Sequence, residues 1–320
     1  MKKVGIITIT GLGNYGNRLQ NYALQYIVEK IACCRCETLI NKPCRMKGYI
    51  KKIIKPNRRI MSVREQIFQQ FNEEFVNFSG YTISNISRNR SLLEYDCLVC
   101  GSDQIWNSDY PENDRANFGY FFPNMKVISY AASFGTDTIA KNKQKRYAKY
   151  LISVREEKGK SLAMQLTGRE DIYLHVDPTL LLTAEEWLAV EKRPKQYNNE
   201  KYILKYFLGE KNSELNRKVE EFAKLQGLSI IDVMSPNSPY YNIGPSEFLF
   251  LERNAELIVT DSFHACVFAI INKRSFIVAE RQEKELQSMG SRIDTLLNKF
   301  HLEERKYNGG SIDKSEGKSH

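Results

Sequence analysis

The chain has 320 residues, of which 42% are hydrophobic and 27% charged, and its formal net charge is +9. The composition is that of a globular protein, and the length exceeds what one hydrophobic core usually serves, so we expect two domains. No apolar run approaches the ~18 residues that a membrane span requires. The first strand starts at the amino terminus without the apolar region and cleavage site of a signal peptide, which predicts a cytoplasmic protein.

The cysteines and the basic residues do not by themselves indicate a metal ion or a nucleic acid. The seven cysteines are an odd-numbered set with no secretory context, and no nearby histidine completes a four-ligand metal site. Nine lysines and arginines lie in 42–64, a stretch with few aromatic residues. We expect a solvated basic face and no nucleic-acid partner; contact with an anionic membrane that carries a lipid-linked substrate is the alternative.

Strands and helices alternate along the first part of the chain, which is typical of parallel, doubly wound α/β sheets. Residues 4–9 are expected to form a buried strand, followed by a glycine-rich loop at 11–16 and a helix with its apolar residues on one face. Segment 65–95 is predicted to be helical and to end in a turn. Further strands are expected at 95–100, 127–132, 150–154 and 172–176.

A polar, proline-containing segment at 191–200 is interpreted as the linker between an N-terminal domain, 1–190, and a C-terminal domain, 201–307. The Gly/Ser/Lys-rich tail, 308–320, is expected to be disordered. Two doubly wound domains in series bind ligands at the carboxyl ends of their strands, so we expect the domains to face each other across a cleft. The second domain is predicted to contain strands at 202–208, 229–234, 257–260 and 275–279, and helices at 212–226, 246–253, 264–272 and 291–299.

The glycine-rich loop matches the spacing of a dinucleotide-binding fingerprint and lies between a strand and a helix. However, the acidic residue that would read a ribose is not in place after the next strand. Asn14, Tyr15 and Asn17 make the loop rich in neutral hydrogen-bonding groups, which suit sugar hydroxyls at least as well as a pyrophosphate. A tight turn without a ligand is an equally open interpretation.

A second polar loop, 101–107, follows an apolar strand. Loops in this position commonly carry function. Its aromatic and polar side chains could hold a pyranose ring, which makes it a candidate acceptor site; alternatively the tryptophan fills the core and the aspartate caps a helix. The candidate acceptor residues in this loop are Ser102, Asp103, Gln104 and Trp106.

Arg155 follows the strand expected at 150–154, where its planar fork could bind a carboxylate or a phosphate. A surface ion pair with a neighbouring glutamate is the alternative. Asp177 follows the next strand; it could orient a base, although a turn-forming role is more common for aspartate there.

His264 follows the strand at 257–260 and opens a helix. Helix N-termini bind anions through backbone N–H groups, which here belong to Ser262 and Phe263. The positive helix end disfavours an imidazolium, and a bound dianion would favour it, so His264 is a candidate acid or base whose charge depends on the substrate. His175 and His301 are interpreted as structural.

Taken together, these segments resemble the polysaccharide pyruvyl transferase family over most of the chain. The resemblance implies two Rossmann-like domains in a GT-B-like pair and transfer of pyruvate from phosphoenolpyruvate to a saccharide, with no bound cofactor. The product would be a ketal that bridges two hydroxyls of a polysaccharide or lipid-linked precursor. The resemblance rests on Asn14-Tyr15-Gly16-Asn17, Leu19-Gln20, Tyr22-Ala23-Leu24-Gln25, Gly101-Ser102-Asp103-Gln104-Ile105-Trp106-Asn107, Ser129-Tyr130-Ala131-Ala132-Ser133-Phe134-Gly135, Ser153-Val154-Arg155-Glu156, Asp177-Pro178-Thr179-Leu180-Leu181, Thr260-Asp261-Ser262-Phe263-His264 and Ser291-Arg292-Ile293.

This chain differs from the family that it resembles in one segment. Relatives carry an Arg-Leu-His triplet where this chain has Ser262-Phe263-His264, so the histidine corresponds and the donor-holding arginine is absent. We expect Arg155, Arg292 and the backbone N–H groups of Ser262 and Phe263 to bind the donor, with His264 as general acid. The alternatives are a GT-B glycosyltransferase that reads a nucleotide with Glu247 or Glu252, and a sugar-binding relative without catalysis.

Overall fold

The computed structural model describes residues 1–40, 60–82, 94–107, 117, 126–136, 152–210, 212–281, 290–310 and 312. Most of the basic segment 42–64 therefore lies outside the described residues. The chain forms two compact units, Met1–Pro178 and Thr179–His320. This boundary falls before the linker that was expected at 191–200.

The first unit is built on a parallel sheet with the strand order β3-β2-β1-β4-β5. A short parallel pair, β6-β7, extends the sheet, since Ala132 bridges both Asp103 and Val154. The strands are β1 (Lys3–Ile7), β2 (Arg35–Ile40), β3 (Phe78–Thr82), β4 (Cys97–Cys100), β5 (Val127–Ser129), β6 (Ser153–Val154) and β7 (Tyr173–Leu174).

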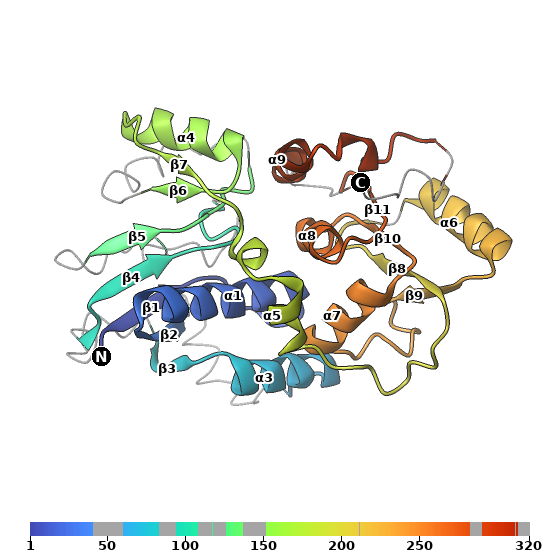
Figure 1. Ribbon diagram of the computed structural model, residues 1–320, viewed down its shortest axis with the longest axis horizontal. Coiled ribbons are helices and arrows are strands. Elements are labelled where there is room, and N and C mark those ends of the chain that lie inside the picture. Colours follow the sequence, from blue (N-terminus) through green and yellow to red (C-terminus); the bar gives the residue numbers. More distant parts are fainter. Residues whose placement is uncertain are drawn as a thin grey trace, which may run out of the picture. The chain divides into compact units, whose positions relative to one another are not determined.

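Helices lie beside the sheet of the first unit (Figure 1). α1 (Tyr15–Ala32) buries Leu24 against Val4 and Ile6. α4 (Glu157–Thr167) buries Leu162 and Ala163 in a second cluster, which contains Leu98 and Cys100 of β4 and Val154 of β6. The third helix, α3 (Val63–Phe75), begins with a capping box at Ser62 and contacts α1.

The prediction of one helix over 65–95 is wrong. The helix ends at Phe75, and β3 follows at Phe78–Thr82. Val76 is already extended, and the amide of Thr38 donates to the carbonyl of Asn77 at 2.7 Å, so pairing with β2 replaces the helical hydrogen bonds. Parallel pairing depends on a distant strand, which a local pattern does not reveal.

The second unit contains a parallel sheet with the order β11-β10-β8-β9. Its strands are β8 (Tyr202–Tyr206), β9 (Ser229–Asp232), β10 (Leu257–Thr260) and β11 (Phe276–Val278). Its helices are α5 (Ala184–Leu188), α6 (Ser213–Gln226), α7 (Pro245–Asn254), α8 (Phe263–Ile271) and α9 (Gly290–Phe300). α6 lies beside the sheet in Figure 1 and buries Leu215, Val219 and Ala223 in the core. The predicted α/β architecture with parallel sheets is confirmed.

Residues before and after this sheet also belong to the second unit. Trp187 of α5 packs edge-on against Phe268, with ring centroids 5.0 Å apart, and Glu191 pairs with Arg253. These contacts explain why the boundary lies at Pro178. In the tail that was expected to be disordered, Ile312 is 9% exposed and belongs to the core, whereas 308–310 are exposed; residues 311 and 313–320 lie outside the described chain.

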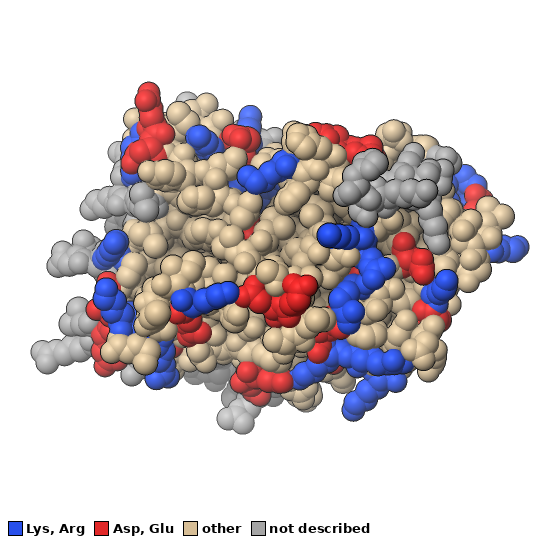
Figure 2. Space-filling model, in the orientation of Figure 1, with Lys and Arg blue, Asp and Glu red and all other residues tan. Residues whose placement is uncertain are grey.

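Acidic and basic side chains of the described residues are intermixed over the face shown in Figure 2. Among the helices that the structure describes, none is long and apolar enough to cross a membrane.

Candidate functional site

A buried charged cluster lies at the carboxyl edge of the sheet in the first unit. The guanidinium of Arg155, just after β6, donates to Asp103 at 2.8 Å and to Asp177 at 2.6 Å. The side chains are 1%, 6% and 0% exposed, respectively. Burial alone would lower the pKa of Arg155, but the carboxylates of Asp103, Asp177 and Glu156 together outweigh burial and raise it. Arg155 is therefore part of an internal ion network and not of a surface ion pair.

The loop after β4 contributes Asp103 and Ser102 to this cluster. Asp103 has a left-handed backbone, with φ of 62°, and its carboxylate is held by Arg155. Ser102 Oγ lies 2.9 Å from Asp177 Oδ2 and 2.9 Å from the carbonyl of Ala131. Gln104 is 6% exposed and accepts a hydrogen bond from Asn107. Three of the four predicted acceptor residues in this loop are thus fixed by internal hydrogen bonds.

The fourth, Trp106, is a core residue. Its indole is 1% exposed, packs at a centroid distance of 5.4 Å from Phe134, and donates through Nε1 to the carbonyl of Asn117. A buried ring presents no face to a sugar, so its position favours the alternative in which the tryptophan fills the core. The aspartate in that alternative was expected to cap a helix, whereas Asp103 instead pairs with Arg155.

The glycine-rich loop leads into α1. Asn14 is the N-cap residue, and its side chain accepts from the amide of Asn17 at 3.2 Å. Both asparagines are partly exposed, whereas Tyr15 is buried and stacks on Phe68 with centroids 5.1 Å apart. Of the three residues predicted to contact the acceptor here, Asn14 and Asn17 are accessible.

Arg18, which was not predicted as a site residue, is fully buried one turn into α1. Within the described chain its hydrogen-bond partners are neutral: the side chains of Asn21 and Asn72, and the carbonyl of Ile9. Burial lowers the pKa of Arg18 to about 10, against the opposing field of Asp103. Its helical spacing from Tyr15 could have revealed it, because an arginine on the apolar face of a helix is unusual.

In the second unit, the segment after β10 leads directly into α8. Ser262 is the N-cap residue, but its side chain makes no capping hydrogen bond, and its amide donates to Thr260 Oγ1 at 3.0 Å. His264 lies in the first turn of the helix and is 6% exposed, with its ring edge-on to Phe263. The predicted place of His264, at a strand-to-helix junction, is confirmed.

Asp261 ties three loops of this unit together. Its two carboxylate oxygens accept the amides of Leu208 and Gly209, after β8, each at 2.7 Å. Arg281, beyond the end of β11, lies with Nε 3.4 Å from the carboxylate and donates from Nη2 to the backbone carbonyl of Asp261 at 3.2 Å. The carboxyl ends of β8, β10 and β11 are thereby joined through one side chain.

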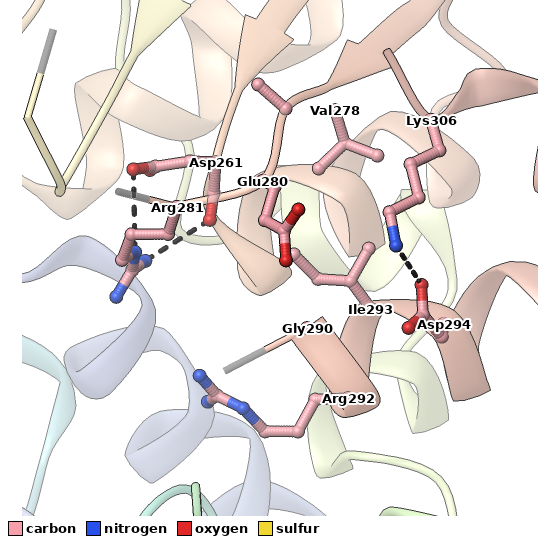
Figure 3. A pocket seen from close by; sticks show the side chains of 10 residues that line it. Asp261, Val278, Glu280, Arg281, Gly290, Arg292, Ile293, Asp294 and Lys306 are labelled. Carbon is pink, nitrogen blue, oxygen red and sulfur yellow. Dashed lines mark hydrogen bonds and ion pairs between the residues drawn. The ribbon is translucent and has the colours of Figure 1, made fainter. Parts of the chain in front are cut away.

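A hollow of about 400 Å³, its open mouth included, lies beside this aspartate (Figure 3). The apolar part of its lining is formed by Val278, Ala279 and Ile293. Arg292, predicted to bind the donor, lines it, is only 5% exposed, and belongs to α9. Its charged lining residues are Asp261, Glu280, Arg281, Arg292, Asp294 and Lys306.

The two glutamates considered for a nucleotide are both placed within α7. Glu247 accepts the amide of Gly244 and so caps the helix. Glu252 is 0% exposed, and within the described chain neither carboxylate oxygen has a hydrogen-bond partner. Burial raises the pKa of Glu252 well above its ordinary value, because it disfavours the charged form. Neither residue is presented to a ribose.

Across the part of the chain that the structure describes, no three His, Cys, Asp or Glu side chains come together as a metal ion would require. Cys34 and Cys36 approach to 3.8 Å between sulfurs and remain thiols. His175 accepts or donates a 2.7 Å hydrogen bond with Ser153 and stacks with Tyr130 and Tyr173.

Two units with parallel sheets, each with polar groups at the carboxyl ends of its strands, define a GT-B-like protein. Similar solved structures include the UDP-GlcNAc 2-epimerase of Methanocaldococcus jannaschii, with a TM-score of 0.57, 14% identity, and coverage of 99% of this chain and 90% of that one. The complex of S. aureus MnaA with UDP has a TM-score of 0.54 and 10% identity, over 99% and 86% of the two chains. At these identities the likeness concerns the fold alone.

The family follows from the sequence itself. The model of the polysaccharide pyruvyl transferase family matches residues 14–282. The chain belongs to this family, and it is accordingly a transferase. No protein of curated function matches it.

Proposed function

We propose that this protein transfers pyruvate from phosphoenolpyruvate to a saccharide and forms a cyclic ketal, in the synthesis of a polysaccharide or of its lipid-linked precursor. The observation that carries the proposal is the arrangement in the second unit. There, a hollow lined by three cationic and three anionic side chains adjoins the loop that leads into His264. Its two arginines offer the planar donor groups that suit the carboxylate or phosphate of a small anionic donor.

On this proposal, Arg292 contributes to binding the donor, because it is a buried guanidinium in the wall of the hollow. Arginine offers a planar fork that matches a carboxylate or a phosphate. Arg155 is left out of the donor contacts, since Asp103 and Asp177 already hold its guanidinium. The amide of Ser262 is left out as well, because it donates to Thr260.

His264 is assigned as the general acid. It delivers a proton to the methylene carbon C3 of phosphoenolpyruvate, which becomes the methyl group. One acceptor hydroxyl adds to C2, the C2–O bond to phosphate breaks, and the neighbouring hydroxyl then closes the ketal. The two hydroxyl protons end on the methyl group, by way of the histidine, and on the released phosphate, so the reaction balances. Positioned proton transfer of this kind contributes roughly 10²–10⁴-fold to a rate.

The acceptor is proposed to bind at the first unit through the accessible asparagines of the loop before α1, Asn14 and Asn17. Amide side chains both donate and accept, which suits sugar hydroxyls. A lipid-linked acceptor would place the protein at the inner face of a membrane. The basic segment 42–64 is the part of the sequence that supports this extension.

The test is to incubate the purified protein with phosphoenolpyruvate or with nucleotide sugars, each with a panel of saccharide acceptors. Acceptor-dependent phosphate release, together with a new ketal methyl signal in the proton NMR spectrum, supports the proposal. Nucleotide release identifies a glycosyltransferase instead. Donor or acceptor binding without release of either product identifies a sugar-binding relative without catalysis.

A further inference from the structure

Position 262 holds serine, so the segment before His264 offers no guanidinium of its own. Arg281 brings one to the same loop from elsewhere in the chain. We propose that Arg281 and Arg292 form a two-arginine subsite for the anionic groups of the donor, a small phosphate- and carboxylate-bearing molecule. This inference rests on the proposed function and assigns a residue, Arg281, that the sequence argument did not single out.

The sheet explains how Arg281 reaches this loop. β10 and β11 pair in parallel, with Thr260 opposite Val278, so their carboxyl ends lie at the same edge. Arg281 follows β11 by three residues and Asp261 follows β10 directly. The guanidinium then donates to the carbonyl of Asp261 at 3.2 Å, one residue before the position that lacks the arginine. The guanidinium of Arg281 therefore reaches Asp261 because β10 and β11 pair in this register, and not because the two residues are close in the sequence.

The two guanidinium groups line the same hollow. Figure 3 shows those of Arg281 and Arg292 on one side of the view, with the ion pair of Lys306 and Asp294 on the other. The Arg281 side chain is 13% exposed, and Arg292 is 5% exposed. A guanidinium held out of bulk water interacts more strongly with an anion than an exposed one does.

Each of the three carboxylates of the hollow has contacts of its own or faces water. Asp294 pairs with Lys306 at 2.8 Å. The carboxylate of Asp261 is held by two backbone amides at 2.7 Å each, in addition to Arg281. Glu280 is exposed, so water and salt screen its charge. The carboxylates of the lining equal its cationic side chains in number, so the preference for an anion depends on the directed N–H groups of the two arginines and not on a net positive charge.

Asp261 also fixes the orientation of Arg281. With Nε toward the carboxylate and Nη2 donating to the carbonyl, the plane of the guanidinium is set by two contacts to one residue. An ammonium group is a point charge and could not be oriented in this way. The subsite therefore requires arginine at position 281, and lysine should replace it only in part.

The experiment measures binding of phosphoenolpyruvate by titration calorimetry and its KM in the phosphate-release assay. Arg281→Gln is expected to weaken binding and raise KM by roughly 10–150-fold, the range for a hydrogen bond to a charged group, with a smaller effect on kcat. Arg281→Lys should give an intermediate loss. Arg253→Gln is the matched control: it removes an arginine of the same unit that pairs with Glu191 outside the hollow, and should leave binding unchanged.

Thermal unfolding of each variant separates loss of the fold from loss of the subsite; should Arg281→Gln unfold, Arg281→Lys carries the test. Wild-type turnover of phosphoenolpyruvate with an unchanged KM in the folded Arg281 variants would overturn this inference and leave the proposed function standing. Failure of the wild-type protein to bind phosphoenolpyruvate would overturn both.

Discussion

Arg155 and Asp177 are joined by a 2.6 Å contact between buried side chains, across the ends of two neighbouring strands. Asp103, from the loop after β4, binds the other side of the same guanidinium. Three segments far apart in the sequence are thus fixed at the carboxyl edge of one sheet. The arginine that sequence reasoning assigned to the donor is instead at the centre of an ion network inside the first unit.

Breaking this network should destabilise the first unit strongly. Arg155→Met leaves the buried carboxylates of Asp103 and Asp177 without their shared partner, and we expect a loss of about 3–5 kcal/mol in the free energy of unfolding. Urea denaturation followed by circular dichroism measures it. Arg169→Met is the control, because its pair with Asp171 is largely solvent-accessible and should contribute only about 0–1 kcal/mol. Equal losses in the two cases would contradict the account.

Glu252→Gln should stabilise the second unit at neutral and alkaline pH. Because burial raises the pKa of Glu252 in the folded protein, its favourable contribution is present below the ordinary glutamate pKa and is lost as the pH rises toward the folded value. The loss approaches about 1.4 kcal/mol per pH unit over that window. Melting temperatures of the wild type and the variant should therefore diverge between pH 5 and 8. Parallel curves would show that the carboxylate is ionised in the folded protein.

Trp106→Ala should affect stability and not acceptor binding. The indole fills the core and lies against Phe134, so truncation should cost about 3–5 kcal/mol. Denaturant unfolding measures the cost, and the acceptor KM is compared at a temperature where the variant remains folded. If stability is unchanged while the acceptor KM rises sharply, the tryptophan is an acceptor platform after all.

His264→Ala should separate turnover from donor binding. We expect kcat for pyruvyl transfer to fall by roughly 10²–10⁴-fold, since a positioned acid is lost, while phosphoenolpyruvate still binds through the arginines. This is the reverse of the pattern expected for Arg281→Gln, in which KM changes more than kcat. A His264→Ala variant with near-normal kcat would exclude the histidine as the acid.

The sequence predicted the elements that carry a strong local signal. The buried strand Leu257–Thr260 is observed with the predicted bounds, and the helix expected at 212–226 begins at Ser213 and ends at Gln226. β3 was not predicted because it is stabilised by pairing with β2, a strand that lies far from it in the sequence. The role of Arg155 was missed for a related reason: its two partners are 52 and 22 residues away, and nothing in its neighbourhood reveals them.

In the candidate site, too, the features with a local sequence signal could be predicted, whereas those that depend on distant residues could not. The position of His264 follows from a strand, a polar turn and an apolar helix that are contiguous in the sequence. Arg281 could not be assigned from the sequence, because its approach to Asp261 depends on the parallel register of β10 and β11. Asn14 caps α1 as its residue type suggests, whereas the burial of Tyr15 depends on Phe68 of a different helix.

The most direct test of the central claim is proton NMR of a reaction that contains the wild-type protein, phosphoenolpyruvate and a panel of saccharide acceptors, with phosphate measured in parallel. The account predicts a ketal methyl signal that grows in step with phosphate release, depends on the acceptor, and is reduced by at least about 10²-fold in His264→Ala. Phosphoenolpyruvate that stays intact with every acceptor, while a nucleotide sugar is consumed, would contradict it.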